Sequence, residues 1–139
     1  AMTAAGRASV FHWPVRVYWE DTDAGGVVYY ANYLKFLERA RSEWLRSLGF
    51  EQPELIARHG GVFVVRRVEA DYLLPARFND SLAIEAALAE QSRVSLVMNQ
   101  RVLRGQEVLM AARVSLAWVD AESFKPARIP AEILESLNV

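Results

Sequence analysis

The segment that decides the fold is EDTDAGGVVYYANYLKFLERARSEWL, which runs from Glu20 to Leu45. Its first half combines two neighbouring acids, a Gly-Gly pair and two adjacent tyrosines. Its second half repeats apolar residues at three- and four-residue spacing, with charged residues between them. Glycine permits positive φ angles and close backbone approach, and the three- and four-residue spacing is typical of an amphipathic helix. The segment therefore predicts a tight turn that leads into a long helix.

The predicted helix has one continuous apolar face. We expect Asn32 to cap its N-terminus and Gly49 to end it. The apolar positions of this face are Tyr33, Phe36, Leu37, Ala40, Trp44, Leu45 and Leu48. Burying each large apolar side chain contributes about 1.5–3 kcal/mol before the loss of conformational entropy is subtracted. The helix is therefore expected to form the centre of the hydrophobic core.

The rest of the chain shows the two-residue period of β-strands. Apolar residues alternate from Phe11 to Trp19, and Pro14 favours either an edge position or an irregular start for this first strand. Four further strands are expected within 62–72, 82–88, 94–102 and 108–118. Pro130 is expected to open a short terminal helix. This order of elements predicts an α+β fold, in which a curved antiparallel sheet packs on one long helix.

Length, charge and composition limit the classes of protein to consider. We expect one domain over residues 10–139, after a flexible N-terminus (1–9) in which Ala1 before Met2 is typical of a cloning remnant. Sixteen basic and seventeen acidic residues give a formal charge of −1, which disfavours a nucleic-acid binder. The chain has no cysteine and no apolar run long enough to span a bilayer. We therefore expect a soluble, cytoplasmic protein without a thiolate nucleophile.

The sequence offers no metal or nucleotide motif. His12 and His59 lie on different predicted elements, and neither has a carboxylate partner at ligand spacing, so no metal site is expected. Ser95 and Ser115 lie in strand patterns rather than in a GxSxG motif. The chain also has no GxGxxG or GxxxxGK motif. Serine hydrolases and nucleotide-dependent enzymes are therefore disfavoured.

The segment from Glu20 to Leu45 resembles the hotdog-fold acyl-CoA thioesterases of the 4-hydroxybenzoyl-CoA thioesterase family. The resemblance is greatest to the branch associated with the Tol-Pal envelope system. ADYLLPARFNDSL from Ala70 to Leu82 and the C-terminal FKPARIP support it, so nearly the whole chain takes part. The resemblance implies a hotdog fold, in which a curved antiparallel β-sheet wraps around one long central α-helix. It also implies a homodimer or homotetramer with active sites between subunits.

The resemblance implies a catalytic site at the turn. Matched by position, the family's catalytic carboxylate is Asp23, and the backbone amide at Tyr30 polarises the thioester carbonyl. Asp21 is then a neighbour whose side chain is expected to close a local turn. Many members of the Tol-Pal branch have His where this chain has Tyr30, but an amide donor does not depend on the side chain. The expected substrate-binding residues are Gly26, Val27, Tyr29 and Asn32.

The implied reaction is hydrolysis of the thioester of an acyl-CoA, or of an acyl group on acyl carrier protein, to a free acid and a thiol. A thiol with a pKa near about 8.5 leaves readily as a thiolate, so neither a strong general acid nor a cofactor is required. Asp23 acts either as a general base toward water or as a nucleophile, and both routes stay open. The Tyr30 amide and the helix entrance supply oxyanion donors, and losing one such donor costs about 3 kcal/mol in the barrier.

The phosphates of coenzyme A call for a local basic cluster. Arg93, Lys125 and Arg128 lie where the resemblance implies nucleotide contacts, and they are the expected phosphate-binding residues. Two other functions stay open. A hotdog hydratase or dehydratase usually needs a histidine that this motif lacks. In a non-catalytic acyl-carrier or envelope-assembly binding module, Asp23 would be only structural.

Overall fold

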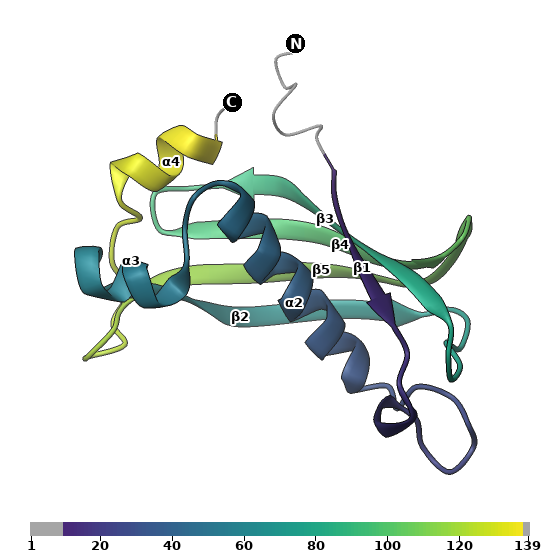
Figure 1. Ribbon diagram of the computed structural model, residues 1–139. Coiled ribbons are helices and arrows are strands. Elements are labelled where there is room, and N and C mark those ends of the chain that lie inside the picture. The colour runs from purple at the N-terminus through teal and green to yellow at the C-terminus, as the bar shows by residue number, and fades with distance from the viewer. Residues whose placement is uncertain (1–9, 138–139) are drawn as a thin grey trace.

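A five-stranded sheet and a long helix dominate the computed structural model, which describes residues 10–137 (Figure 1). The strands are β1 (Phe11–Arg16), β2 (Gly61–Tyr72), β3 (Ser81–Gln91), β4 (Ser95–Arg104) and β5 (Glu107–Asp120). The helices are the 3₁₀ turn η1 (Trp19–Asp21), α2 (Asn32–Ser47), α3 (Gln52–His59) and α4 (Ala131–Leu137). The N-terminal segment that was predicted to be flexible lies outside the described residues.

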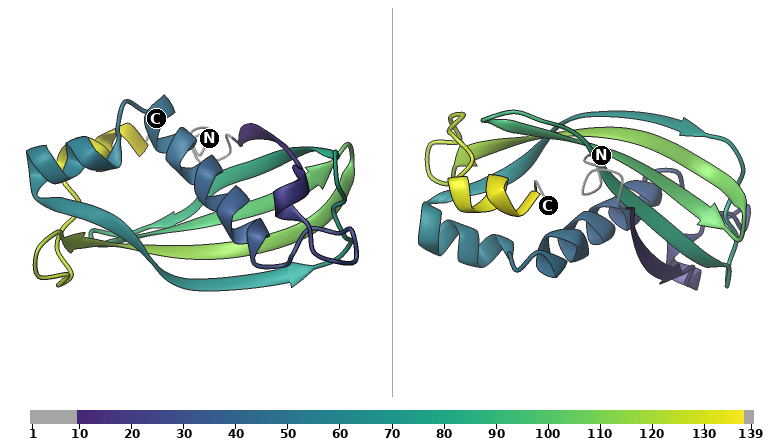
Figure 2. Two further views of the ribbon diagram at one scale, coloured as in Figure 1. Left: turned by 60° about the horizontal axis from the view of Figure 1, so that its bottom comes forward. Right: turned by 90° about the horizontal axis from the view of Figure 1, so that it is seen from above.

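The sheet is entirely antiparallel, with the strand order β1-β3-β4-β5-β2. β1 is an edge strand, which is one of the two alternatives that Pro14 favoured, and β2 is the other edge. Irregular pairing between Val65 and Arg67, and between Leu88 and Glu90, interrupts two of the ladders. Such bulges bend a strand and increase its twist. The sheet curves around α2, which lies across its concave face (Figure 2).

The core lies between α2 and the sheet. Phe36, Leu37 and Ala40 on α2 are at most 1% exposed, and α2 packs against β1, β3 and β4. The inward-facing residues of β3 are the alternate positions Leu82, Ile84, Ala86 and Leu88, all of which are buried. Side chains at every second position of a strand share one face, so the two-residue period located this part of the core correctly.

The structure contains one helix more than the long helix and the short terminal helix that we expected. α3 begins with Pro53 in its first turn, ends at Gly60 with φ of 66°, and packs against β2. α4 follows Pro130 directly, as predicted. Both helices lie at the end of the sheet away from the turn before α2 (Figures 1 and 2). The description of one long central helix is therefore incomplete, because it accounts for α2 alone.

The ends of two elements also differ from the prediction. The N-cap of α2 is Ala31, and the Asn32 side chain instead donates a hydrogen bond to the Asp21 carbonyl, so the predicted cap is wrong. Gly49 does end the helix, with φ of 95° and its amide bonded to the Arg46 carbonyl. The first strand stops at Arg16, and η1 turns Trp19 outward, leaving it 71% exposed.

Candidate active site

A tight turn between η1 and α2 carries Asp23. The Asp23 amide donates to the Val27 carbonyl at 2.9 Å, and the Gly26 amide donates to the Asp23 carbonyl at 3.0 Å. Gly26 has φ of 79°, a backbone region that favours glycine. Asp23 is exposed, and its Oδ1 accepts a hydrogen bond from the Gly25 amide at 2.8 Å. Its Oδ2 has no partner among residues 10–137, so one carboxylate oxygen is available to a ligand or water.

Asp21 ties this turn to the start of α2. Its carbonyl accepts hydrogen bonds from the Tyr29 amide at 3.1 Å and from Asn32 Nδ2 at 2.9 Å. Its carboxylate accepts a hydrogen bond from the Tyr18 amide at 2.8 Å, which is the local turn-closing role predicted for it. Asp23 follows only two residues later in the chain. The hydrogen bonds of Asp21 therefore keep the Asp23 turn close to the first turn of α2.

The entrance to α2 presents unpaired backbone donors. Within the described part of the chain, the amides of Tyr30 and Ala31 donate no hydrogen bond. The first amides of a helix have no intrahelical acceptor and carry the positive end of the helix dipole. Such donors can bind an anion or a polarised carbonyl oxygen. The Tyr30 amide is the one that the family resemblance pointed to.

An apolar pocket of about 250 Å³ opens beside this entrance. It is lined by Val28, Tyr30, Tyr33, Tyr72, Leu73, Leu74 and Pro75. The Tyr72 ring contacts Tyr30 and Tyr33 edge to face, with ring centroids 6.1 Å and 5.4 Å apart. Burial raises the pKa of Tyr72, with smaller contributions from Tyr30 and Tyr33. The pocket walls are therefore neutral and aromatic, which suits an uncharged acyl group.

The expected substrate-binding residues are split between this pocket and its surroundings. Tyr30 lines the pocket, whereas Gly26, Val27, Tyr29 and Asn32 belong to the turn and the helix start without lining it. The Tyr29 ring packs on Tyr30 at 4.9 Å between centroids, and the neighbouring Tyr30 raises the pKa of Tyr29. The strand period of β2 gave no sign that its last residues would line a pocket with α2.

A second pocket, of about 560 Å³, lies at the other end of the sheet and contains Arg93 and Arg128. The Ile129 amide donates to the Arg93 carbonyl at 2.7 Å, which joins the β3–β4 turn to the segment before α4. Among residues 10–137, neither guanidinium has a carboxylate within 4 Å. The structure therefore brings two of the predicted phosphate ligands together and leaves Lys125 outside the pocket.

The two pockets are far apart in a single chain. Tyr72 in the first pocket pairs with Met110 of β5, and the turn that holds Arg93 leads into the pairing of Ser95 with Ala117. Met110 and Ala117 are seven positions apart on β5, which corresponds to about 24 Å along the strand.

The described residues contain no cluster suited to a metal. No group of three or more His, Asp or Glu side chains within 10–137 could hold an ion. His12 lies 3.2 Å from Glu85 on the sheet, and His59 lies 3.8 Å from Glu132, where α3 approaches α4. None of the helices in this part of the chain is long and apolar enough to cross a membrane.

An antiparallel sheet curved around a long helix, with an acidic turn at the helix entrance, defines the hotdog class of α+β protein. A family model described as "Thioesterase-like superfamily" matches residues 17–137, so the chain belongs to the thioesterase-like superfamily. This confirms the resemblance noted from the sequence.

Individual relatives agree with this family. The chain is 44% identical over 123 residues to "Acyl-CoA thioesterase YbgC" of Haemophilus influenzae, covering 88% of this chain and 90% of the relative. A probable thioesterase from Bartonella henselae has 37% identity and a TM-score of 0.83, covering 88% of this chain and all of the other. A 4-hydroxybenzoyl-CoA thioesterase, complexed with 4-hydroxybenzoyl-CoA, has a TM-score of 0.87 at 23% identity over 94% of this chain and 99% of its own, which shows a shared fold.

Proposed function

We propose that this protein hydrolyses acyl-CoA thioesters to a free acid and coenzyme A. Thioester hydrolysis is the activity named for relatives that match it over most of their length. The observation that supports a mechanism is the frame built by Asp21, which holds the Asp23 carboxylate and the unpaired Tyr30 amide on one short segment. A carboxylate beside helix-entrance donors supplies the two functions that thioester cleavage needs.

In the proposed mechanism, the thioester carbonyl accepts a hydrogen bond from the Tyr30 amide, and the acyl group enters the pocket beside it. The Gly25 amide orients the Asp23 carboxylate through Oδ1. Oδ2 then either takes a proton from the attacking water or attacks the carbonyl carbon itself. In the second route, loss of the thiolate leaves a mixed anhydride on Asp23, and a water molecule hydrolyses it to the free acid and the restored carboxylate. The thiolate leaves without a general acid, because its conjugate thiol is acidic. Coenzyme A takes part only as a portion of the substrate.

Replacing Asp23 by Asn tests this mechanism. We expect kcat of Asp23→Asn to fall by at least about 100-fold, because the amide can neither accept a proton nor attack. Glu20→Gln is the matched control, since Glu20 is an exposed acid in the same segment. Release of free thiol from benzoyl-, hexanoyl- and palmitoyl-CoA measures both. Parent-like turnover by Asp23→Asn would remove this residue from the mechanism, and acyl-CoA binding without turnover by the parent would favour a binding module.

We further propose that the active unit is a homodimer joined through β2. β2 is an edge strand of 12 residues, and its Val65, Val68 and Tyr72 side chains are 48%, 39% and 44% exposed. An exposed edge with apolar side chains is a template for pairing with another strand. In a two-fold dimer, antiparallel pairing of the two β2 strands sets the start of one strand beside the end of the other.

This arrangement would resolve the separation of the two pockets. The Arg93–Arg128 pocket lies near the start of β2, and the acyl pocket includes Tyr72 at its end. Arg93 of the partner subunit would then face the acyl pocket of this chain across the dimer. We propose that coenzyme A spans this interface, with its thioester at one protomer and its phosphates at the other.

Mixed dimers test the shared site. One chain carries Asp23→Asn and the other carries Arg93→Ala with Arg128→Ala. Random pairing puts one fully intact site in half of the dimers, so about a quarter of the parent activity should return after mixing and refolding. If each site lies within one chain, mixing restores nothing. Light scattering with Val65→Lys, which adds a charge to the edge, measures whether the dimer uses β2.

We expect Arg93 and Arg128 to affect KM for acyl-CoA, because coenzyme A carries nucleotide phosphates. A charge-assisted hydrogen bond contributes about 1.5–3 kcal/mol, so Arg93→Ala should raise KM for acyl-CoA by on the order of tenfold or more. Acyl carrier protein, the second candidate substrate, presents the same thiol without the nucleotide, and its KM should not change. Lys125→Ala tests the third predicted phosphate ligand. The cytoplasm is the proposed compartment, and the Tol-Pal association stays a prediction.

A further inference from the structure

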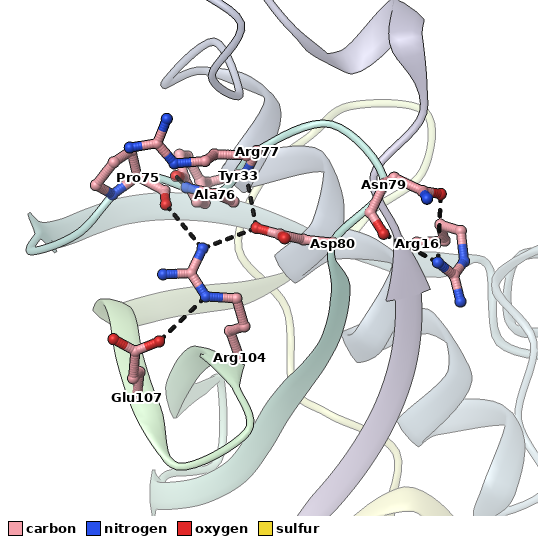
Figure 3. A network of polar contacts seen from close by, with 9 residues as sticks. All are labelled: Arg16, Tyr33, Pro75, Ala76, Arg77, Asn79, Asp80, Arg104 and Glu107. Atoms are coloured by element: carbon pink, nitrogen blue, oxygen red, sulfur yellow. Dashed lines mark hydrogen bonds and ion pairs between the residues drawn. The ribbon is translucent and has the colours of Figure 1, made fainter.

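A polar network holds residues 75–80, which we call the support loop, against the β4–β5 hairpin (Figure 3). Arg104 Nη1 donates to Asp80 Oδ2 at 2.8 Å and to the Pro75 carbonyl at 3.2 Å, and Arg104 Nε donates to Glu107 Oε1 at 3.1 Å. Asp80 Oδ2 also accepts a hydrogen bond from the Arg77 amide at 2.8 Å. A single guanidinium therefore holds both ends of the support loop.

The support loop is also held from β1. Asn79 has φ of 71°, a left-handed conformation that asparagine tolerates better than most residues. Arg16 Nη1 donates to the Asn79 carbonyl at 2.9 Å and to its Oδ1 at 3.3 Å (Figure 3). The Asn79 amide donates to the Val17 carbonyl at 2.9 Å. The loop conformation is thus set by contacts from two strands and not by its own sequence alone.

The support loop contacts the candidate active site on its buried side. The Val28 amide donates to the Ala76 carbonyl at 2.8 Å, and Val27 forms a β-bridge with Arg77. The Ala76 amide donates to the Tyr33 hydroxyl at 2.9 Å. Ala76, Tyr33 and Val28 are 0%, 3% and 4% exposed, so water does not compete for these bonds. The support loop therefore contacts both Val27 and Val28, which follow the Asp23 turn, and Tyr33 in the first turn of α2.

We propose that Arg104 and Asp80 are positioning residues for thioester hydrolysis. They fix the support loop, and through Val28 and Tyr33 the loop fixes the relative position of Asp23 and the Tyr30 amide. The inference rests on the proposed roles of those two groups. Misplacement of a reacting group by about 1 Å can cost on the order of 100-fold in rate. Loss of the network should therefore appear mainly in kcat.

The same sheet provides a matched control. Arg101, three residues earlier on β4, donates Nε to Glu85 Oε1 at 2.6 Å and Nη2 to Oε2 at 3.1 Å. Its side chain is 48% exposed, against 29% for Arg104. The hydrogen bonds of Arg101 join β4 to β3 and do not reach the support loop. Removing Arg101 deletes a comparable ion pair without touching the active-site frame.

Steady-state kinetics of Arg104→Leu, Arg104→Lys, Asp80→Asn and Arg101→Leu test the proposal, with each variant assayed where it is fully folded. We expect Arg104→Leu to lower kcat by about 10–100-fold while KM stays within about twofold. Arg104→Lys and Asp80→Asn should lose less, because each keeps part of the network. Arg101→Leu should keep the parent kcat. Parent-like kcat in Arg104→Leu, or an equal loss in Arg101→Leu, would overturn the inference. If Arg104→Leu does not fold, Arg104→Lys and Asp80→Asn carry the comparison.

Hydrogen exchange provides a second readout that does not need turnover. Amide exchange at Val28 and Ala76, measured by NMR, should be faster in Arg104→Leu and unchanged in Arg101→Leu. If Asp23→Asn keeps its activity while Arg104→Leu loses this protection, the proposed mechanism fails and the structural link to the turn stands. If Asp23→Asn is inactive while Arg104→Leu keeps both kcat and protection, the positioning inference fails alone.

Discussion

The substitution Tyr33→Phe removes one hydroxyl group and tests the hydrogen bond that joins α2 to the support loop. The Tyr33 hydroxyl accepts a hydrogen bond from the Ala76 amide at 2.9 Å, and Tyr33 and Ala76 are 3% and 0% exposed. In Tyr33→Phe the ring remains and keeps its edge contact with Phe36, whose centroid lies 6.3 Å away. The Ala76 amide, however, loses its acceptor in a site that water does not reach.

The size of the effect follows from this geometry. A buried donor left without an acceptor costs about 1–3 kcal/mol. Unfolding entropy is roughly 2 cal/mol/K per residue, or about 0.3 kcal/mol/K for 139 residues. A destabilisation of about 2 kcal/mol therefore lowers Tm by about 7 °C. We also expect kcat to fall, because the Ala76 carbonyl of the same loop holds Val28.

Thermal unfolding followed by circular dichroism measures this prediction. Tyr72→Phe is the matched control, because Tyr72 is 44% exposed and its hydroxyl makes no hydrogen bond within residues 10–137. Its Tm should stay within about 1 °C of the parent, as is usual for an exposed substitution. A Tyr33→Phe variant that also unfolds within about 1 °C of the parent would show that the buried amide is not paired as described.

Three further perturbations have defined outcomes. Gly61→Ala should destabilise by about 1–3 kcal/mol in urea, because a Cβ there would lie 2.5 Å from Trp118 Cε2; an unchanged midpoint would contradict this. Gly26→Ala has open space but φ of 79°, so it should cost about 1–2 kcal/mol through backbone strain and lower kcat. Burial opposes ionisation of Asp80, but a backbone amide and Arg104 outweigh it and lower its pKa. That stabilisation is present above the unfolded pKa of about 3.9 and is lost as pH falls through the folded value, so the urea midpoints of parent and Asp80→Asn should converge below about pH 4. A difference between the two urea midpoints that persists at low pH would refute the stabilising role of the Asp80 carboxylate.

Periodicity located most elements because side-chain direction follows the backbone repeat. In β3 and α2 the apolar residues recur at the strand and helix periods, and most of these positions are buried; Trp44 and Leu48 on α2 are partly buried. α3 was missed because eight residues offer too few repeats: Leu55 is 1% exposed, but the adjacent Ile56 is 44% exposed. The strand period predicted that Trp19 faces inward, which is wrong, because β1 ends at Arg16 and Trp19 lies beyond the sheet.

The acidic turn could be predicted from the sequence alone, because Asp23, the glycines and the start of α2 lie on one short segment, and the hydrogen bonds that close the turn around Asp23 are local. The sequence also determined which face of α2 would be buried. Three further features depend on the tertiary fold: Tyr72 and Pro75 line the pocket beside Tyr30, Arg93 and Arg128 share a second pocket, and Arg104 reaches the support loop. These groups are distant in the chain and meet through strand pairing and curvature. No local pattern of residues encodes such a meeting, because it depends on how separate elements pack.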